Sequence, residues 1–263
     1  MNVRVSFNRN EIVAMSPSGK IGLVATKNAD GLPHLSFLTS IMPIDEKHMC
    51  IGEFCRGESK RNMQINREVG WLIMTMDRRL WRGLANWTHL KKEGSEYETY
   101  NRQPMFRYNT YFGINTVHYL DLLEAGAEET LPLLKIGIST ALTAATAHGL
   151  HEEGPKVMNH FSRALFDNFK SLKFIAYIDS EGKPRVVPLL QCRASDSHRL
   201  AFCPLAYGNE LKNIEPGSSV AVMALSMQME NVLVRGVFAG FRRSFGLRLG
   251  QIDLNYVYNS MPP

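Results

Sequence analysis

Residues 57–63 read Gly-Glu-Ser-Lys-Arg-Asn-Met, a short polar turn that follows one β-rich stretch and opens a helix leading to the next. A serine hydroxyl, two adjacent cations and the N–H groups of a helix start are the donors that an anion needs, a phosphate above all. A solvated, charged turn has the same composition, because Lys and Arg cluster at many turns. The residues around the heptad therefore decide between the two interpretations.

Short β-rich segments separated by turn residues surround this heptad. The turn at 28–31 joins the first two segments into a hairpin, and an amphipathic helix capped by Asn10 precedes them. Such strands, with one helix among them, predict a small antiparallel Greek-key barrel. The polar, Tyr-rich stretch 91–109 leads to the last strand, and the residues from Tyr97 to Tyr111 suit a substrate lid and an interface loop equally. The six expected strands are 21–26, 33–42, 48–54, 69–76, 80–90 and 116–123.

The second half of the chain repeats the first. When the numbering is shifted by 151, residues 30–33 (Asp-Gly-Leu-Pro) fall on 181–184 (Glu-Gly-Lys-Pro), and Gly57 falls on Gly208. Turn glycines, a proline and strand hydrophobics coincide in this way over some 60 residues, which indicates two copies of one fold. We expect a mainly β protein of two tandem six-stranded split barrels, at residues 1–125 and 160–263.

A helical connector at 126–159 joins the two copies. Thr130 and Pro132 mark one helix start, and a second helix is expected from Pro155, followed by apolar residues at helical spacing. His148, His151, His160, Glu152 and Glu153 also lie in or beside this connector. Glycines interrupt the segment and no three of these side chains share a helical face, so we expect no metal site.

Composition describes an ordinary globular chain. It has 263 residues, 44% of them hydrophobic and 21% charged, with a net charge of +5 and a pI near 9.0. The basic residues form no stripe interleaved with aromatics, so no nucleic-acid partner is expected. The amino terminus lacks an apolar signal core and the most apolar stretch, 131–147, is interrupted, so no membrane partner and a cytoplasmic location are expected. The cysteines match no zinc spacing and are expected to be reduced core thiols: Cys50, Cys55, Cys192 and Cys203.

Several motifs occur together in the order found in a known family. They are Leu-Val-Ala-Thr at 23–26, Asp-Gly-x-Pro-His at 30–34, Ser-Lys-x-Asn-Met at 59–63, Asn-Arg-Glu-Val at 66–69 and Trp-Arg-Gly at 81–83. With this set the chain resembles the flavin-binding split barrels related to pyridoxamine 5′-phosphate oxidase. In that family two barrels pack side by side and FMN lies between them. The resemblance implies that this chain forms an intrachain pseudo-dimer, and it leaves a further homodimer open.

The resemblance also implies which residues hold the flavin. Ser59 and Lys60 match the phosphate-holding positions, with Arg56 and Arg61 as nearby cations and Asn62 as a brace for the turn. The main chain of four strand residues matches the stretch that lines the flavin ring: Ser36, Phe37, Leu38 and Thr39. Trp81 or Trp87 could also contact the ligand, although strand tryptophans are more often core.

The second copy departs from the phosphate motif. Glu210 stands where Ser59 does and Leu211 where Lys60 does, and only Lys212, aligned with Arg61, keeps a positive charge. A carboxylate repels a phosphate and a leucine offers it no donor. We therefore expect one flavin per chain, in the first copy, and a second only if Lys212 and Arg235 take over.

Two functions from different classes follow. The first is an FMN-dependent oxidoreductase that moves a hydride or electrons between a donor and a small organic acceptor, with no catalytic side chain. The second is a flavin- or haem-binding module without turnover, that is, a carrier, store or sensor; a barrel that binds no cofactor is a weaker third. Nothing identifies a pyridoxal-phosphate-type substrate pocket, so the oxidase activity that names the family is not expected. No Walker loop, nucleophile elbow or paired carboxylates support a phosphotransferase or hydrolase.

Overall fold

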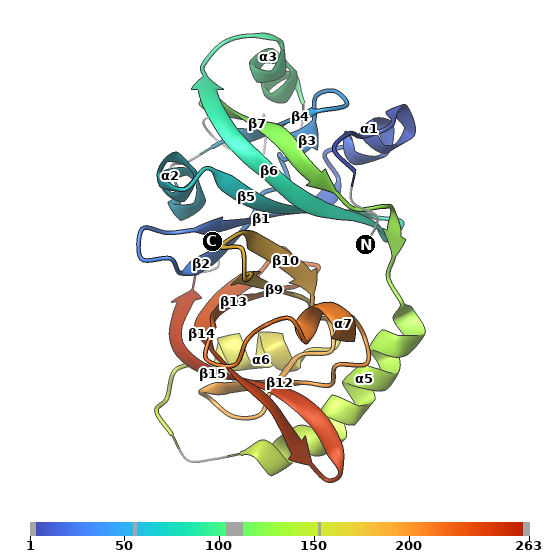
Figure 1. The fold of residues 1–263 in the computed structure, drawn as a ribbon, viewed down its shortest axis with the longest axis vertical. Coiled ribbons are helices and arrows are strands. Elements are labelled where there is room, and N and C mark those ends of the chain that lie inside the picture. Colours follow the sequence, from blue (N-terminus) through green and yellow to red (C-terminus); the bar gives the residue numbers. More distant parts are fainter. Residues whose placement is uncertain (1–3, 55–56, 104–112, 152–153, 260–263) are drawn as a thin grey trace. The chain divides into compact units, whose positions relative to one another are not determined.

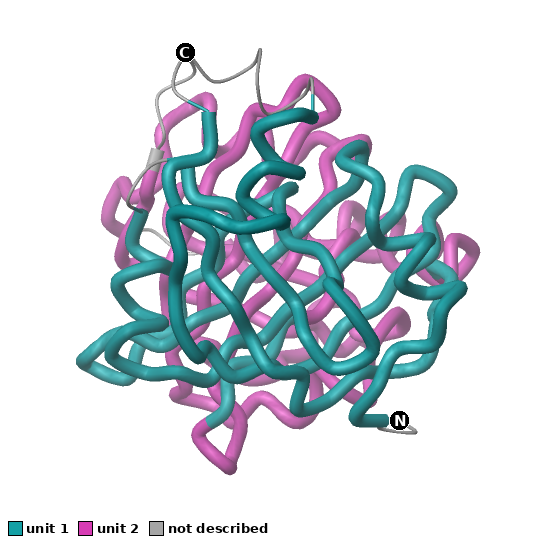
Figure 2. The backbone as a smooth tube through the Cα atoms, turned by 90° about the horizontal axis from the view of Figure 1, so that it is seen from above, with its two compact units in different colours: residues 1–131, 183–186 teal, residues 132–182, 187–263 magenta. Residues whose placement is uncertain are grey.

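The computed structural model describes residues 4–54, 57–103, 113–151 and 154–259, and it shows two antiparallel sheets, one after the other in the chain (Figure 1). The protein is mainly β, with few helices, as the sequence predicts. The chain divides into two compact units (Figure 2). The first holds residues 1–131 and 183–186, and the second holds residues 132–182 and 187–263.

The first sheet has the strand order β2-β1-β5-β6-β7-β4-β3, and β8 pairs with β6. Its strands are β1 (Lys20–Lys27), β2 (Pro33–Phe37), β3 (Met42–Pro43), β4 (His48–Glu53), β5 (Glu68–Thr75), β6 (Arg79–Lys91), β7 (Thr116–Ala125) and β8 (Glu129–Thr130). The helices among the described residues of this unit are α1 (Arg9–Met15), α2 (Glu58–Ile65) and α3 (Ser95–Arg102).

The second sheet repeats that order strand for strand, as β10-β9-β13-β14-β15-β12-β11. The internal repeat read from the sequence is therefore present in the fold. Its strands are β9 (Leu172–Ile178), β10 (Pro184–Pro188), β11 (Arg193–Ala194), β12 (Arg199–Phe202), β13 (Ser219–Leu225), β14 (Asn231–Ser244) and β15 (Leu247–Asn259). The accompanying helices are α5 (Leu133–Thr146), the 3-10 helix η1 (Ala147–Leu150), α6 (His160–Asp167) and α7 (Gly208–Leu211).

Alternate residues along the strands of the first sheet are buried together in one hydrophobic core. Val69, Trp71 and Ile73 are alternate residues of β5, and all three are buried in the same cluster. Alternate residues of a strand point to one face, and β1, β4, β6 and β7 add their inward residues to this cluster too. The sheet therefore curls around its own core. Met15 of α1 and Met63 of α2 complete the cluster.

The expected strand 33–42 is two strands, because the chain turns after Phe37. The N–H of Leu38 donates to the carbonyl of Gly22 (2.8 Å), and the N–H of Ile41 closes a turn onto the carbonyl of Leu38 (3.2 Å). A Cβ at Gly22 would overlap both the Leu38 carbonyl and the Ile41 side chain. Only glycine permits this close approach, which places the turn that follows β2.

Two helix starts differ from the sequence expectation, and one helix was not expected. Asn8 rather than Asn10 caps α1, because its side chain accepts from the N–H of Glu11 and Glu11 accepts from the N–H of Asn8. The helix expected from Pro155 begins at His160, where Asn159 supplies the cap. The stretch 91–109 contains α3, which was not predicted; its Tyr100 is buried and donates to the carbonyl of Ser40, so it is no lid residue. Residues 104–112 lie outside the described residues.

Cys50, Cys192 and Cys203 are buried and free, as the sequence predicts; Cys55 lies outside the described residues. In the part of the chain that the structure describes, no helix has both the length and the apolar character needed to cross a bilayer. The helix predicted after Pro132 is present as α5.

We predict that Gly22→Ala destabilises the first unit by about 2 kcal/mol or more, because the new methyl group would collide with backbone. Gly19→Ala is the control: nothing lies near its Cβ position, so we expect a change within about 0.5 kcal/mol. Urea unfolding followed by tryptophan fluorescence reports on this unit alone, because Trp71, Trp81 and Trp87 are the only tryptophans of the chain. Equal stability of the two variants would contradict the role given to Gly22.

Candidate functional site

The start of α2 carries two positive features at one point. Gly57 is the N-cap residue and makes no side-chain hydrogen bond there, so no side-chain cap occupies the first amides of the helix. The Lys60 ammonium lies 3.9 Å from the point where a Cβ on Gly57 would stand. The side chain of Lys60 is therefore folded back over the helix start. A helix N-terminus and an ammonium at the same place suit an anion.

A chain of hydroxyl contacts joins this helix start to β2. The Oγ atoms of Ser59 and Ser36 are 2.6 Å apart. On the other side, Ser36 Oγ is 3.1 Å from Nε2 of His34. The Nδ1 atom of His34 lies 3.6 Å from Oε2 of Glu58, the first residue of α2. The structure thus brings together one residue from each of the two predicted stretches, Ser36 and Ser59.

Ser59 and Lys60 are both buried, with exposed fractions of 1% and 5%. Asn62 is buried as well and donates to Thr26 Oγ1 (3.1 Å), which fastens α2 to β1. Arg61, by contrast, is exposed. Arg56 lies outside the described residues.

The predicted ring-lining stretch straddles the end of β2. Ser36 and Phe37 are its last two residues, and Leu38 and Thr39 lie in the turn that Gly22 permits. All four are half-buried. Of the tryptophans, Trp81 is fully buried in the core, as is Trp71, whereas Trp87 is half-buried.

His118 is a buried histidine close enough to Lys60 to feel its charge, and its two hydrogen-bond partners determine which ring nitrogen carries the proton. The indole N–H of Trp87 is 3.1 Å from Nδ1 of His118, and Nε2 of His118 is 2.7 Å from Oε2 of Glu53. An indole nitrogen only donates, so Nδ1 carries no proton and the neutral imidazole donates from Nε2 to Glu53. Burial lowers the pKa of His118, and the charge of Lys60 lowers it further, against the raising effect of Glu53.

The same start in the second unit is built differently. The helix α7 has four residues, and Tyr207 before it adopts a left-handed backbone conformation (φ 54°). Leu211, in the position of Lys60, is fully buried and belongs to the hydrophobic core. Lys212 is exposed. The Arg235 guanidinium lies over the Tyr256 ring, 4.2 Å from its centroid.

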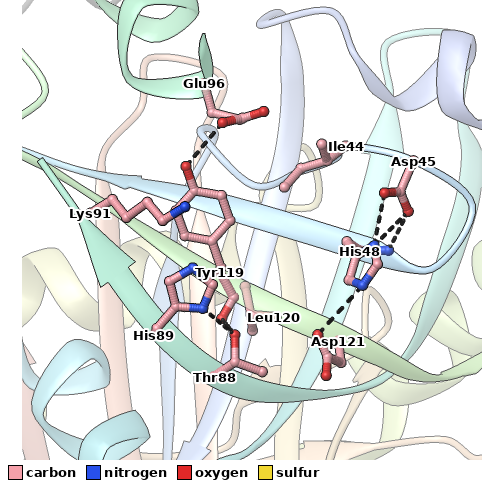
Figure 3. Close-up of a pocket in the computed structure, with 10 residues that line it drawn as sticks. All are labelled: Ile44, Asp45, His48, Thr88, His89, Lys91, Glu96, Tyr119, Leu120 and Asp121. Carbon is pink, nitrogen blue, oxygen red and sulfur yellow. Dashed lines mark hydrogen bonds and ion pairs between the residues drawn. The ribbon is translucent and has the colours of Figure 1, made fainter. Parts of the chain in front are cut away.

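The first unit also has a hollow of about 460 Å³ whose lining contains none of the predicted flavin ligands (Figure 3). His48 sits there between Asp45 (2.8 Å) and Asp121 (3.8 Å). The rings of His89 and Tyr119 stack with centroids 4.6 Å apart. Three carboxylates, those of Asp45, Asp121 and Glu96, face the single ammonium of Lys91 in this lining, so the hollow does not suit a dianion.

Sequence reasoning missed His34, Glu53 and His118 as neighbours of the predicted site. His34 could have been predicted as a neighbour, because alternate residues of a strand share a face and His34 lies two residues before Ser36 in β2. His118 shares a face of β7 with the core residues Leu120 and Leu122, and a histidine on an apolar face is a candidate for a buried polar contact. The described residues contain no group of three or more His, Cys, Asp or Glu side chains placed to hold a metal ion.

No protein-family model and no curated protein matches the chain. Several solved structures do. A putative pyridoxamine 5′-phosphate oxidase from Lactobacillus delbrueckii is 18% identical and matches 47% of this chain and 96% of its own, with a TM-score of 0.37. An FMN-binding protein from Syntrophomonas wolfei is 11% identical over 47% of this chain and 84% of its own (TM-score 0.38). The protein HupZ from Group A Streptococcus is 16% identical over 45% of this chain and 91% of its own (TM-score 0.37).

We predict that His118 makes the first unit sensitive to acid. Its pKa is lowered in the folded state, so the unfolded chain takes up this proton first and stability falls as the pH drops below about 6.5. Glutamine can accept from Trp87 and donate to Glu53 without titrating, so His118→Gln should flatten the loss of stability between about pH 7.5 and 5.5. Urea unfolding followed by tryptophan fluorescence measures it. A profile as steep as that of the unmodified protein would contradict the assignment.

Proposed function

We propose that the first unit binds FMN, with the flavin phosphate at the start of α2, and that the protein is an FMN-dependent oxidoreductase acting on a small organic acceptor. One observation supports this most directly. The Lys60 ammonium lies over an uncapped helix start, and the adjacent Ser59 contacts the strand that leads into the predicted ring-lining stretch.

A phosphate fits the donors gathered there. Lys60 and the Ser59 hydroxyl offer charge-assisted hydrogen bonds, and the helix amides point the same way. Because both side chains are buried, such bonds form in a low dielectric and are stronger than at the surface. A phosphate dianion bound there places two negative charges beside the buried ammonium.

The half-buried stretch after Ser36 is proposed to hold the flavin ring. Phe37 and Leu38 offer apolar surface, and the turn at Leu38 and Thr39 offers backbone donors and acceptors. When bound, a flavin supplies hydride and single-electron transfer. On this proposal the side chains bind and orient the cofactor, and none is assigned a step in the chemistry.

We propose one flavin per chain. In the second unit the counterpart of Lys60 is the core residue Leu211, so no ammonium lies at that position of α7. The pairing of the two barrels within the chain, and of chains with each other, stays a prediction.

The visible spectrum of the purified protein tests the cofactor. We expect the two flavin bands, and their bleaching by a reduced nicotinamide under anaerobic conditions if the protein is an oxidoreductase. A flavin that no electron donor reduces would instead support a carrier. A Soret band would replace flavin by haem, and a colourless protein that takes up no added FMN would overturn the proposal.

Substitution of Lys60 locates the phosphate. Lys60→Met keeps the volume of the buried stem and removes the charge, so FMN affinity should fall by about 1.5–3 kcal/mol, or about 10- to 150-fold. Affinity for riboflavin, which lacks the phosphate, should change little. Lys212→Ala in the second unit is the matched control and should leave both affinities unchanged. Equal losses in the two variants, by fluorescence titration, would contradict a site in the first unit.

A further inference from the structure

The contacts between His34, Ser36 and Ser59 carry an inference that rests on the proposed function and deepens it. We propose that His34 is a positioning residue for a phosphate monoester dianion: it takes up one proton when the dianion binds, and Ser36 passes the resulting change of hydrogen-bond direction to Ser59. We call the hydrogen-bonded series His34–Ser36–Ser59 the relay. Which of its atoms can donate a proton decides which class of ligand it favours.

Without a ligand, Glu58 sets the direction of the relay. Its carboxylate accepts only, and it lies 3.6 Å from Nδ1 of His34, so a proton on Nδ1 is favoured. In the neutral imidazole, Nε2 then has a lone pair and accepts from the Ser36 hydroxyl at 3.1 Å. Ser36 has a single proton, already given to His34, so its oxygen accepts from Ser59 at 2.6 Å. Ser59 therefore donates toward Ser36.

A bound dianion reverses this direction. A phosphate dianion offers only acceptors, so Ser59 must turn its proton toward the ligand. The Ser59 oxygen then accepts from Ser36, and the Ser36 oxygen in turn needs a donor, which Nε2–H of His34 provides at 3.1 Å. The neutral Nε2–H tautomer could also donate, but the Glu58 carboxylate at 3.6 Å favours keeping the proton on Nδ1, so we take the ring to become an imidazolium. One proton enters from solvent, and no bond other than hydrogen bonds forms or breaks.

Two effects on His34 oppose one another. Its ring is buried, and burial disfavours a second proton and the charge that it brings. Glu58, at ion-pair distance, favours it. A ligand with two negative charges favours the protonated ring more strongly than a ligand with one. The relay therefore selects a terminal phosphate monoester, which is a dianion above about pH 6, over a diester or pyrophosphate with one charge per phosphate.

For flavins this means FMN rather than FAD. Neutral riboflavin should bind without proton uptake, because it has no group that requires Ser59 to donate outward. Wherever the uptake of one proton is complete, the FMN association constant falls about tenfold for each pH unit.

Calorimetric titration of the full chain with FMN, in buffers of different ionisation enthalpy at about pH 7.5, counts the protons. We expect uptake approaching one with FMN and none with riboflavin. His34→Gln can still donate to Ser36 without titrating, so it should lose the uptake. His151→Gln, an exposed histidine of the second unit, is the matched control and should keep it.

The outcomes separate this inference from the flavin assignment. FMN binding without uptake, or with the same uptake in His34→Gln, overturns the relay and leaves the FMN site standing. If no flavin binds, the proposed function fails, and titration with inorganic phosphate then decides the relay alone. Phosphate binding with uptake that depends on His34 supports it, and binding without that uptake, or no binding, overturns it.

Discussion

A buried ammonium at the positive end of a helix is the constraint on which the site depends. The helix start and the Lys60 charge repel each other, and burial removes the water that would screen them. Glu58 in the first turn and Glu53 beside His118 add negative charge to the same region. On the proposed function, an anion bound there adds negative charge between the helix start and the ammonium.

The second unit has the same fold without a lysine at the position of Lys60. Both sheets have the same strand order, because it depends on alternating hydrophobic residues and turns, which both halves keep. At the position of Lys60, Leu211 adds apolar surface to the core, and α7 has four residues where α2 has eight. The repeated fold is thus independent of the polar site, and a duplicated copy can lose the site and gain core packing.

The strands could be predicted from the sequence because one face of each is buried, so that hydrophobic residues recur at every second position in most strands. It did not predict the break after Phe37, which depends on the close approach of Gly22 and Leu38, residues on different strands. Cap positions were missed by two residues at α1 and five at α6, since several polar residues near each start can accept the same N–H groups. The heptad gave the helix and its positive start. The contacts of His118, by contrast, arise only when β4, β6 and β7 meet.

The two histidines near this helix show how a partner's chemistry decides what a titratable group can do. His118 faces a donor-only indole on one side and a carboxylate on the other, so its neutral form satisfies both neighbours and a second proton would cost the bond to Trp87. His34 faces a carboxylate and a hydroxyl, and a hydroxyl can accept as readily as it donates. The hydrogen-bond direction is therefore fixed at His118, whereas the hydroxyl beside His34 can either donate to its ring or accept from it. Both histidines are buried, so burial does not explain the difference in their hydrogen bonding. The difference comes from whether each neighbouring atom can donate a proton, accept one, or do both.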